Sequence, residues 1–299
     1  MGGAIQVSIT LSGLGRLFGG RLEGVVETAA AAERAGVDQV ALPDHLAIGP
    51  RTDRYPYGPF PLPSDEPWLE PFVALAAIAG ATQRIRLATS VLVAPLRPAL
   101  LLAKSAATLD VLSRGRLDLG VGVGWQRDEL EGAGVPFAGR TARLDDALRA
   151  CRLLWRGERV SYRSASVTFE DLVSLPRPVQ RDGPPIWFGV APTPENAARI
   201  AELGAGWMPI GSDLDQIARG VDRLRAALAR AGRDPDSLGV RAHAPVAIGA
   251  RGRADLERTL ARLPEMGARG VTVAAFALGR FVRTHGDVEP FLARLGRRT

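Results

Sequence analysis

The chain has 299 residues, of which 46% are hydrophobic and 23% charged, and it contains one cysteine. This composition is typical of a packed globular protein, and it excludes the disordered, collagen-like and coiled-coil classes. The 38 basic and 32 acidic residues give a net charge of +6, but the arginines are scattered among acidic residues. We therefore expect no nucleic-acid partner, and an anionic small molecule remains compatible with this charge.

The sequence also carries no sign of export or membrane insertion. No apolar run approaches the roughly 20 residues needed to cross a bilayer, and the N-terminus lacks the charged and apolar regions of a secretory signal. Cys151 alone cannot form an intrachain disulfide. We expect a cytoplasmic protein without membrane association, in which Cys151 is a buried core residue.

Short apolar runs alternate along the chain with longer stretches of helical periodicity. The expected strands are Ala4–Leu11, Gln39–Leu42, Ile85–Val93, Leu117–Val123, Pro185–Val190, Gly206–Ile210, Val240–Ile248 and Val271–Phe276. The expected helices are Arg21–Ala35, Leu69–Ala79, Ala99–Leu112, Thr141–Trp155, Pro194–Leu203, Leu214–Ala231, Ala254–Met266 and Glu289–Leu295. This α/β alternation predicts a (β/α)8 TIM barrel that forms a single domain over residues 1–299. A two-domain Rossmann arrangement is the weaker alternative, because no GxGxxG motif follows a strand.

Glycines mark the expected helix ends. A glycine adopts the left-handed conformation that closes a helix without steric penalty. The glycines expected in this role are Gly36, Gly115, Gly204, Gly232 and Gly267.

Two segments interrupt the alternation. The segment Leu46–Trp68 follows the second strand and contains six prolines together with Tyr55, Tyr57 and Phe60. The segment Glu158–Gln180 precedes the fifth strand and alternates like a β-hairpin. We expect both to be insertions at the barrel rim, the first of them at the C-terminal face that carries the active sites of such barrels.

The second expected strand ends at Pro43-Asp44-His45, where a barrel places functional residues. His45 at this position is suited to general acid or base chemistry near neutral pH, with Asp44 as the carboxylate that orients it. In the structural alternative, Asp44 caps a turn and His45 is a loop residue with its hydrogen bonds satisfied. Position alone leaves both open.

The fourth expected strand runs through alternating glycines from Gly120 to Gly124 and ends at Trp125. Such glycines allow a flat or phosphorylated ligand to approach the backbone, or they make room for neighbouring side chains. Ser90 interrupts an apolar strand, for which a hydroxyl bonded to the backbone is the simplest explanation. The three histidines lack metal-ligand spacing, so no metal site is expected.

Several segments, taken together, resemble the bacterial luciferase-like monooxygenase superfamily. They cover residues 32–45, 84–110, 113–125, 134–137, 184–189 and 203–209, within a resemblance that extends over about residues 4–280. The GVGVGW form of residues 120–125 is similar to the branch that uses the deazaflavin coenzyme F420. The resemblance implies an F420-dependent oxidoreductase that moves a hydride between ring carbon C5 and a small organic substrate.

The resemblance also implies roles for individual residues. Asp44 and His45 would be the catalytic residues beside the ring, and Ser90–Val91 would be a non-prolyl cis peptide that backs it. The cofactor-binding residues would be Asp44, Ser90, Val91, Gly122, Gly124, Trp125, Gly189, Val190, Ala191, Met208 and Pro209. Since members of the superfamily are often dimers, a homodimer is expected.

The chain departs from the family pattern at two positions. Trp125 stands where the F420-dependent sugar-phosphate dehydrogenases carry a catalytic glutamate, which argues against that substrate and for an aromatic, apolar pocket. The family's Gly-Gly after the fifth strand is here Gly189-Val190. Arg51 and Arg54 are candidates to meet an anionic substrate or cofactor tail, the alternative being solvated loop arginines.

Two other functions stay open. One is an FMN-dependent monooxygenase that uses O₂ together with a partner reductase. The other is a barrel that binds a flavin or deazaflavin without catalysis.

Overall fold

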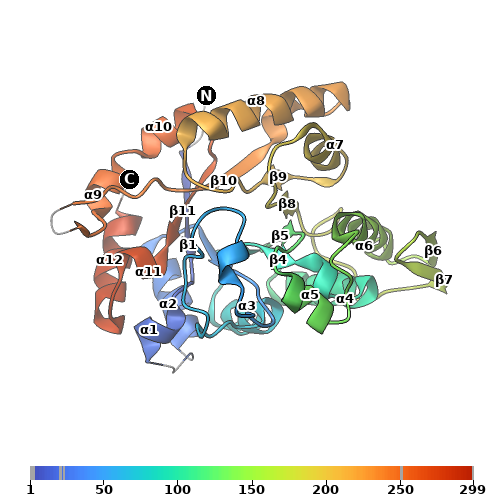
Figure 1. The fold of residues 1–299 in the computed structure, drawn as a ribbon, viewed down its shortest axis with the longest axis horizontal. Coiled ribbons are helices and arrows are strands. Elements are labelled where there is room, and N and C mark those ends of the chain that lie inside the picture. Colours follow the sequence, from blue (N-terminus) through green and yellow to red (C-terminus); the bar gives the residue numbers. More distant parts are fainter. Residues whose placement is uncertain (1–3, 20–21, 23, 250–251, 298–299) are drawn as a thin grey trace.

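The computed structural model describes residues 4–19, 22, 24–249 and 252–297, which form a closed barrel of parallel strands (Figure 1). In barrel order the strands are β3 (Arg86–Thr89), β2 (Gln39–Leu42), β1 (Gln6–Thr10), β11 (Val273–Ala277), β10 (Gly239–His243), β9 (Gly206–Trp207), β8 (Ile186–Phe188) and β5 (Leu117–Gly122). Pairing of β3 with β5 closes the ring, and the short strand β4 (Leu92–Val93) adds to β5 beyond it. The expected TIM-barrel fold is confirmed.

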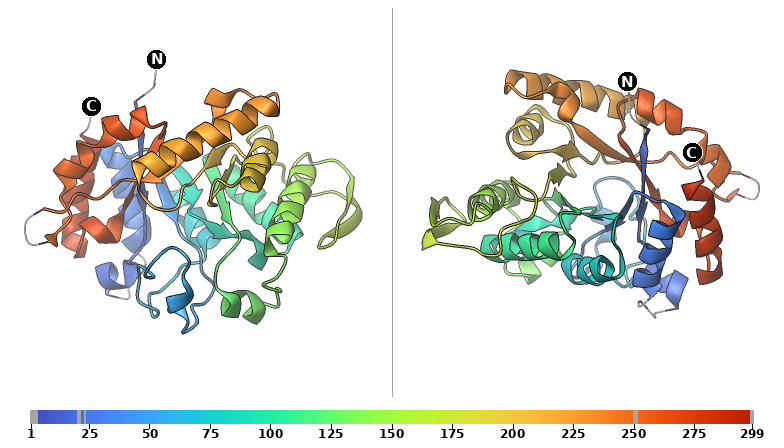
Figure 2. Two further views of the ribbon diagram at one scale, coloured as in Figure 1. Left: turned by 45° about the horizontal axis from the view of Figure 1, so that its top comes forward. Right: turned by 180° about the vertical axis from the view of Figure 1, so that it is seen from behind.

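The helices surround the strands, as the views in Figure 2 show. They are α1 (Leu14–Phe18), α2 (Gly24–Ala35), α3 (Pro71–Ala81), α4 (Ala99–Leu112), α5 (Arg127–Gly132), α6 (Arg140–Leu154), α7 (Pro194–Leu203), α8 (Leu214–Arg230), α9 (Leu256–Leu260), α10 (Leu263–Ala268), α11 (Leu278–Phe281) and α12 (Val288–Gly296). None of the helices in the described part of the chain is long and apolar enough to span a membrane.

Side-chain spacing explains why these elements pack as they do. Every residue of β2 and β5 is buried, as parallel strands covered by helices require. Helix α8 buries Leu214, Ile217, Val221, Leu224 and Leu228, which recur every three or four residues along one face. Cys151 of α6 is buried in the same core, as expected, and burial raises the pKa of its thiol.

Both expected insertions are present. Residues 158–180 contain the antiparallel strands β6 (Val160–Arg163) and β7 (Thr168–Leu172), which project at one edge of the molecule in Figure 1. The segment Leu46–Trp68 contains only the short 3₁₀ helix η1 (Thr52–Arg54) among its loops.

Some expected details are wrong. The single helix expected over Ala254–Met266 is divided into α9 and α10, because Pro264 lacks the N–H group that a continuous helix needs. The strand expected over Val240–Ile248 ends at His243. Gly36, Gly115 and Gly232 have the expected positive φ. Gly204 has a φ of −92°, and Gly267 lies inside α10, where Gly270 supplies the left-handed turn instead.

The contact between β3 and β5 is unusually close at Gly120. The hydroxyl of Thr89 donates to the Gly120 carbonyl oxygen over 2.6 Å. A Cβ atom at Gly120 would overlap the carbonyl oxygen of Thr89 and lie 2.9 Å from Cε of Met208. The barrel therefore requires a glycine at this position.

We expect Gly120→Ala to lower the free energy of unfolding by about 3 kcal/mol, because backbone atoms of β3 and β5 have to separate. Chemical denaturation followed by circular dichroism measures this loss. The control is Gly80→Ala in α3, where nothing lies within 4 Å of the added Cβ. It should be neutral or stabilise the protein by up to about 1 kcal/mol. Equal unfolding midpoints for the two variants would contradict this account.

Candidate functional site

Val91 forms a small platform at the C-terminal end of the barrel. The Ser90–Val91 peptide bond is cis, as the resemblance implied. A Cβ atom at Gly122 would lie 2.8 Å from Cγ2 of Val91, and one at Gly189 would lie 2.7 Å from Cγ1. The two glycines thus leave room for Val91 to lie against β5 and the end of β8.

A third glycine, Gly124, follows β5 and leaves room for a side chain in the same way. Gly124 has a φ of 76°, and a Cβ atom there would lie 2.6 Å from Cγ1 of Val93. Of the two explanations for the alternating glycines, the structure supports packing room for neighbouring side chains. Direct contact of Gly122 and Gly124 with a cofactor stays a prediction.

His45 lies beside a buried carboxylate that the sequence did not single out. Its Nδ1 atom is 2.9 Å from Oε2 of Glu129 in α5, whose side chain is 1% exposed. Oε1 of Glu129 accepts the N–H of Leu46 at 2.6 Å, and Oε1 of Gln126 accepts the N–H of Gly49 at 2.8 Å. Helix α5 therefore holds both the ring of His45 and the loop that follows it. In the sequence, the sign of this contact is the position of Gln126 and Glu129 directly after Trp125.

The expected pairing of Asp44 with His45 is wrong. Both oxygens of Asp44 are engaged by the guanidinium of Arg97, at 2.7 and 3.1 Å, and one of them also accepts the N–H of Val93 at 2.8 Å. Arg97 donates to Glu70 as well, at 2.7 Å. Burial alone would lower the pKa of Arg97, but its bonds to Asp44 and Glu70 outweigh burial and raise it. Asp44, which follows β2, is thus hydrogen-bonded to Val93 of β4 and to Arg97 shortly after it.

Aromatic side chains from the loop after β2 form one wall of the site. The ring centroid of Trp125 lies 5.2 Å from Tyr55, 5.4 Å from Phe60 and 6.0 Å from His45. Trp68 approaches His45 from another side at 4.7 Å. His45 is therefore surrounded by apolar ring surfaces, as expected from a tryptophan at position 125.

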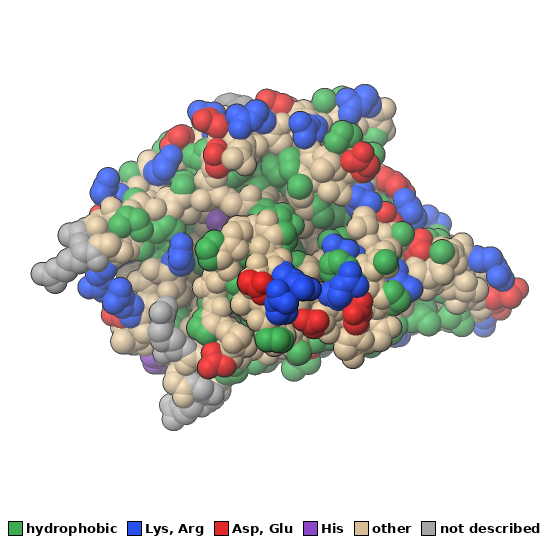
Figure 3. All heavy atoms as spheres, in the orientation of Figure 1, with side chains coloured by type: hydrophobic (Ala, Val, Ile, Leu, Met, Phe, Trp, Pro, Cys, Tyr) green, Lys and Arg blue, Asp and Glu red, His purple; other side chains and the backbone are tan. Residues whose placement is uncertain are grey.

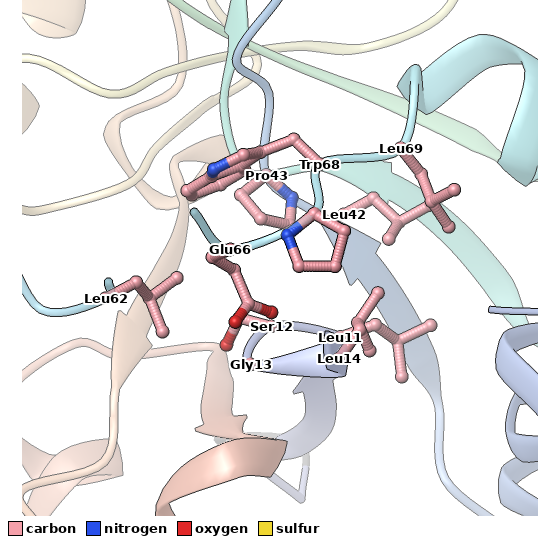
Figure 4. A pocket seen from close by; sticks show the side chains of 11 residues that line it. Leu11, Ser12, Gly13, Leu14, Leu42, Pro43, Leu62, Glu66, Trp68 and Leu69 are labelled. Carbon is pink, nitrogen blue, oxygen red and sulfur yellow. The ribbon is translucent and has the colours of Figure 1, made fainter. Parts of the chain in front are cut away.

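Behind Trp68, the loop encloses a cavity of about 10 Å³ against the ends of β1 and β2 (Figure 4). Glu66 at its edge accepts the N–H of Gly15 at 3.0 Å. The cavity holds a single water molecule at most, so it cannot receive a cofactor. It lies where the loop is anchored to the barrel.

The remaining predicted cofactor residues line the neighbouring strand ends. The carbonyl oxygen of Val190 accepts the indole N–H of Trp207 at 2.8 Å, and Ala191 is exposed. Met208 and Pro209 are buried after β9. Their contact with a cofactor stays a prediction.

The two loop arginines differ in their surroundings. Arg51 forms an ion pair with Asp53 at 2.9 Å, so its charge is already balanced. Arg54 is exposed in η1.

Figure 3 shows basic and acidic side chains interspersed over this face, and a hollow between the loop after β2 and helix α8.

His243 lies at the end of β10, two residues after Arg241 and thus on the same side of the strand. Burial, with the charges of Arg241 and Arg280, lowers the pKa of His243 from 6.5 to about 4. The side chain is therefore neutral at physiological pH.

The comparisons with known proteins cover most of the chain. A family model described as "Luciferase-like monooxygenase" matches residues 6–288. An uncharacterized protein of Mycobacterium tuberculosis is 40% identical over 71% of this chain and 76% of its own length. A phthiodiolone/phenolphthiodiolone dimycocerosates ketoreductase from the same species is 34% identical over 83% of this chain and 67% of its own.

Solved structures share the fold at low sequence identity. An F420-dependent secondary alcohol dehydrogenase in complex with an F420-acetone adduct has a TM-score of 0.78 at 16% identity, with 99% of this chain and 98% of that one covered. The oxygenating constituent of 3,6-diketocamphane monooxygenase from Pseudomonas putida, in complex with FMN, has a TM-score of 0.64 at 18% identity, with 80% and 67% covered.

We expect Glu129→Ala to increase amide exchange at Leu46 and Ala47 by at least about tenfold, because both N–H groups donate to its carboxylate. Hydrogen exchange followed by NMR measures this at single residues. The control is Glu131→Ala on the same helix, where an exposed carboxylate pairs with Arg127. Equal exchange in the two variants would show that Glu129 does not hold the loop.

We expect stability to fall as the pH drops from about 6.5 toward 4, by about 2 kcal/mol attributable to His243. The unfolded chain takes up a proton on this histidine in that window, whereas the folded chain does not. Urea unfolding across this pH range should give a shallower dependence for His243→Gln than for the wild type. Parallel curves would mean that His243 titrates normally in the folded state.

Proposed function

The chain belongs to the luciferase-like monooxygenase family, and from this premise we propose that it is an F420-dependent oxidoreductase acting on a small ketone or secondary alcohol. The family membership makes it a flavin- or deazaflavin-dependent oxidoreductase. The ketoreductase relative and the alcohol dehydrogenase of the same fold support the choice of substrate class. The GVGVGW sequence of residues 120–125 supports the choice of F420.

The observation that carries the proposal is that Val91 and His45 follow the paired ends of the neighbouring strands β3 and β2. Both methyl groups of Val91 pack against Gly122 and Gly189, and the side chain stays partly exposed. A partly exposed apolar side chain held in this way fits one face of a planar ring. When bound, F420 supplies hydride transfer at ring carbon C5. The protein has to bind the ring, orient the substrate and transfer one proton to or from the substrate oxygen.

His45 is the proposed group for that proton. Its Nδ1 atom contacts Glu129, and Nε2 has no hydrogen-bond partner among the residues that the structure describes. A substrate oxygen at Nε2 could therefore receive or return a proton as the hydride moves. The rings of Tyr55, Phe60 and Trp125 give the site an apolar wall, which suits an apolar substrate.

Titration of the apoprotein with F420 and, separately, with FMN tests the cofactor. We expect F420 to bind and its fluorescence to change, with FMN binding much more weakly. Tight FMN binding without F420 binding would overturn the proposal in favour of the monooxygenase alternative. Binding of F420 without turnover of any ketone or secondary alcohol would favour the non-catalytic alternative.

We expect His45→Ala to lower turnover by about 10²–10⁴-fold while the affinity for F420 changes little. Steady-state assays with F420 and a panel of secondary alcohols measure this. The control is His285→Ala, an exposed histidine that packs against Phe18. Unchanged turnover in His45→Ala would exclude the acid/base role.

The homodimer and the cytoplasmic location stay predictions.

A further inference from the structure

On the side of β10, the interior of the barrel contains a buried cation. Arg241 is 2% exposed. Its guanidinium donates, over distances between 2.8 and 3.3 Å, to the uncharged side chains of Ser8, Thr10, Gln39 and Ser90. Burial lowers the pKa of Arg241 to about 10, so the group stays charged at neutral pH. This charge acts on whatever lies next to it toward the mouth of the barrel.

His243 is the side chain of β10 that lies nearer the mouth. It follows Arg241 by two residues on the same face of the strand, and its backbone is paired with Ala275 of β11. The ring is partly exposed, and its nitrogens reach solvent and have no hydrogen-bond partner among the residues that the structure describes. Burial of the ring and the charges of Arg241 and Arg280 lower its pKa to about 4. The neutral ring therefore has one N–H group free to donate at neutral pH.

Arg280 lies over the same side of the mouth. Strand β11 runs directly into helix α11, and a Cβ atom at Gly279 in this helix would lie 2.9 Å from the carbonyl oxygen of Ser12. Helix α11 is therefore packed against the segment that follows β1. Arg280, the next residue, is exposed, and its side chain forms no hydrogen bond or ion pair within the described part of the chain. Its charge acts on His243, so the two side chains lie within electrostatic range.

The two sides of the mouth thus differ in character. In the ring of strands, β10 is the fourth strand from β3 in both directions, so it lies opposite β3. The aromatic wall around Trp125 and the ring of His45 follow β5 and β2, the two neighbours of β3. The charges that act on His243 both lower its pKa, whereas a carboxylate nearby would raise it. A hydrogen-bond donor and an unpaired cation without an acid between them are suited to an oxyanion.

We propose that His243 and Arg280 bind a carboxylate group of the substrate on the side of the mouth opposite β3, so that the substrate is a hydroxy acid or an oxo acid. This inference rests on the proposed function. A carboxylate carries one negative charge, which matches the single unpaired charge of Arg280. The N–H group of His243 donates to one carboxylate oxygen and the guanidinium of Arg280 to the other. The apolar part of the substrate and its reacting carbon then extend toward His45.

Binding of simple carboxylates to the apoprotein tests the site without the cofactor. The probes are acetate and hexanoate, each compared with the alcohol of the same length, ethanol or 1-hexanol. The histidine ring signals in proton–carbon NMR spectra, assigned with His243→Gln, report binding. We expect both carboxylates to shift the His243 signal with saturation, and the alcohols to bind at least about tenfold more weakly. A His243 signal that neither carboxylate moves would overturn the inference.

Variants then separate a site from general charge attraction. Arg280→Gln should weaken hexanoate binding about tenfold, because it removes a charged donor. The matched control is Arg283→Gln, which removes an exposed arginine whose charge is not among those that act on His243. This variant should bind hexanoate as the wild type does. Equal weakening in the two variants would overturn the inference.

A hexanoate titration with F420 already bound distinguishes the substrate from the cofactor as the source of the carboxylate. We expect hexanoate to bind beside F420 with little change in affinity. Loss of hexanoate binding in the presence of F420 would assign the site to an anionic part of the cofactor and overturn the inference. If F420 itself does not bind, the proposed function fails, whereas the His243 signal still decides whether the carboxylate site exists.

Discussion

The mouth of this barrel depends on how closely the segment after β3 lies against β5. Because Gly120 and Gly122 have no side chains that would clash with that segment, Val91 packs directly against the strand. This placement also brings the N–H of Val93 to Asp44 and the hydroxyl of Ser90 to Arg241. One close approach therefore sets the position of Val91, of the Asp44–Arg97 salt bridge and of the hydrogen bond between Arg241 and Ser90.

The charged groups around Val91 differ in their hydrogen-bond partners. On the side of β2 and β5, the carboxylates of Asp44 and Glu129 are occupied by Arg97 and by His45 with its loop. From the side of β10, Arg241 supplies a charge that uncharged groups surround.

The barrel could be predicted because its signal is local. Each strand is a short apolar run and most helices show clear periodicity, so even the limits of α4 and α7 followed from the residues alone. The cis peptide at Ser90–Val91 followed only from the family resemblance. Gly204 failed as a left-handed helix end because a glycine in sequence permits such a conformation without requiring it.

The partners within the site could not be predicted in the same way. His45 and Glu129 are 84 positions apart, and Arg241 reaches Ser90 over 151 positions. Only the closed barrel brings such residues together, and a lone arginine in a strand gives no sign of which hydroxyls will surround it. Asp44 stood next to His45 in sequence, yet adjacent residues of an extended segment point in opposite directions.

The central claim is that the Val91 platform carries a deazaflavin ring, and a crystal structure of the protein with F420 tests it most directly. The account predicts density for the ring against Val91, within reach of His45. Density for the ring elsewhere, away from Val91, would contradict it.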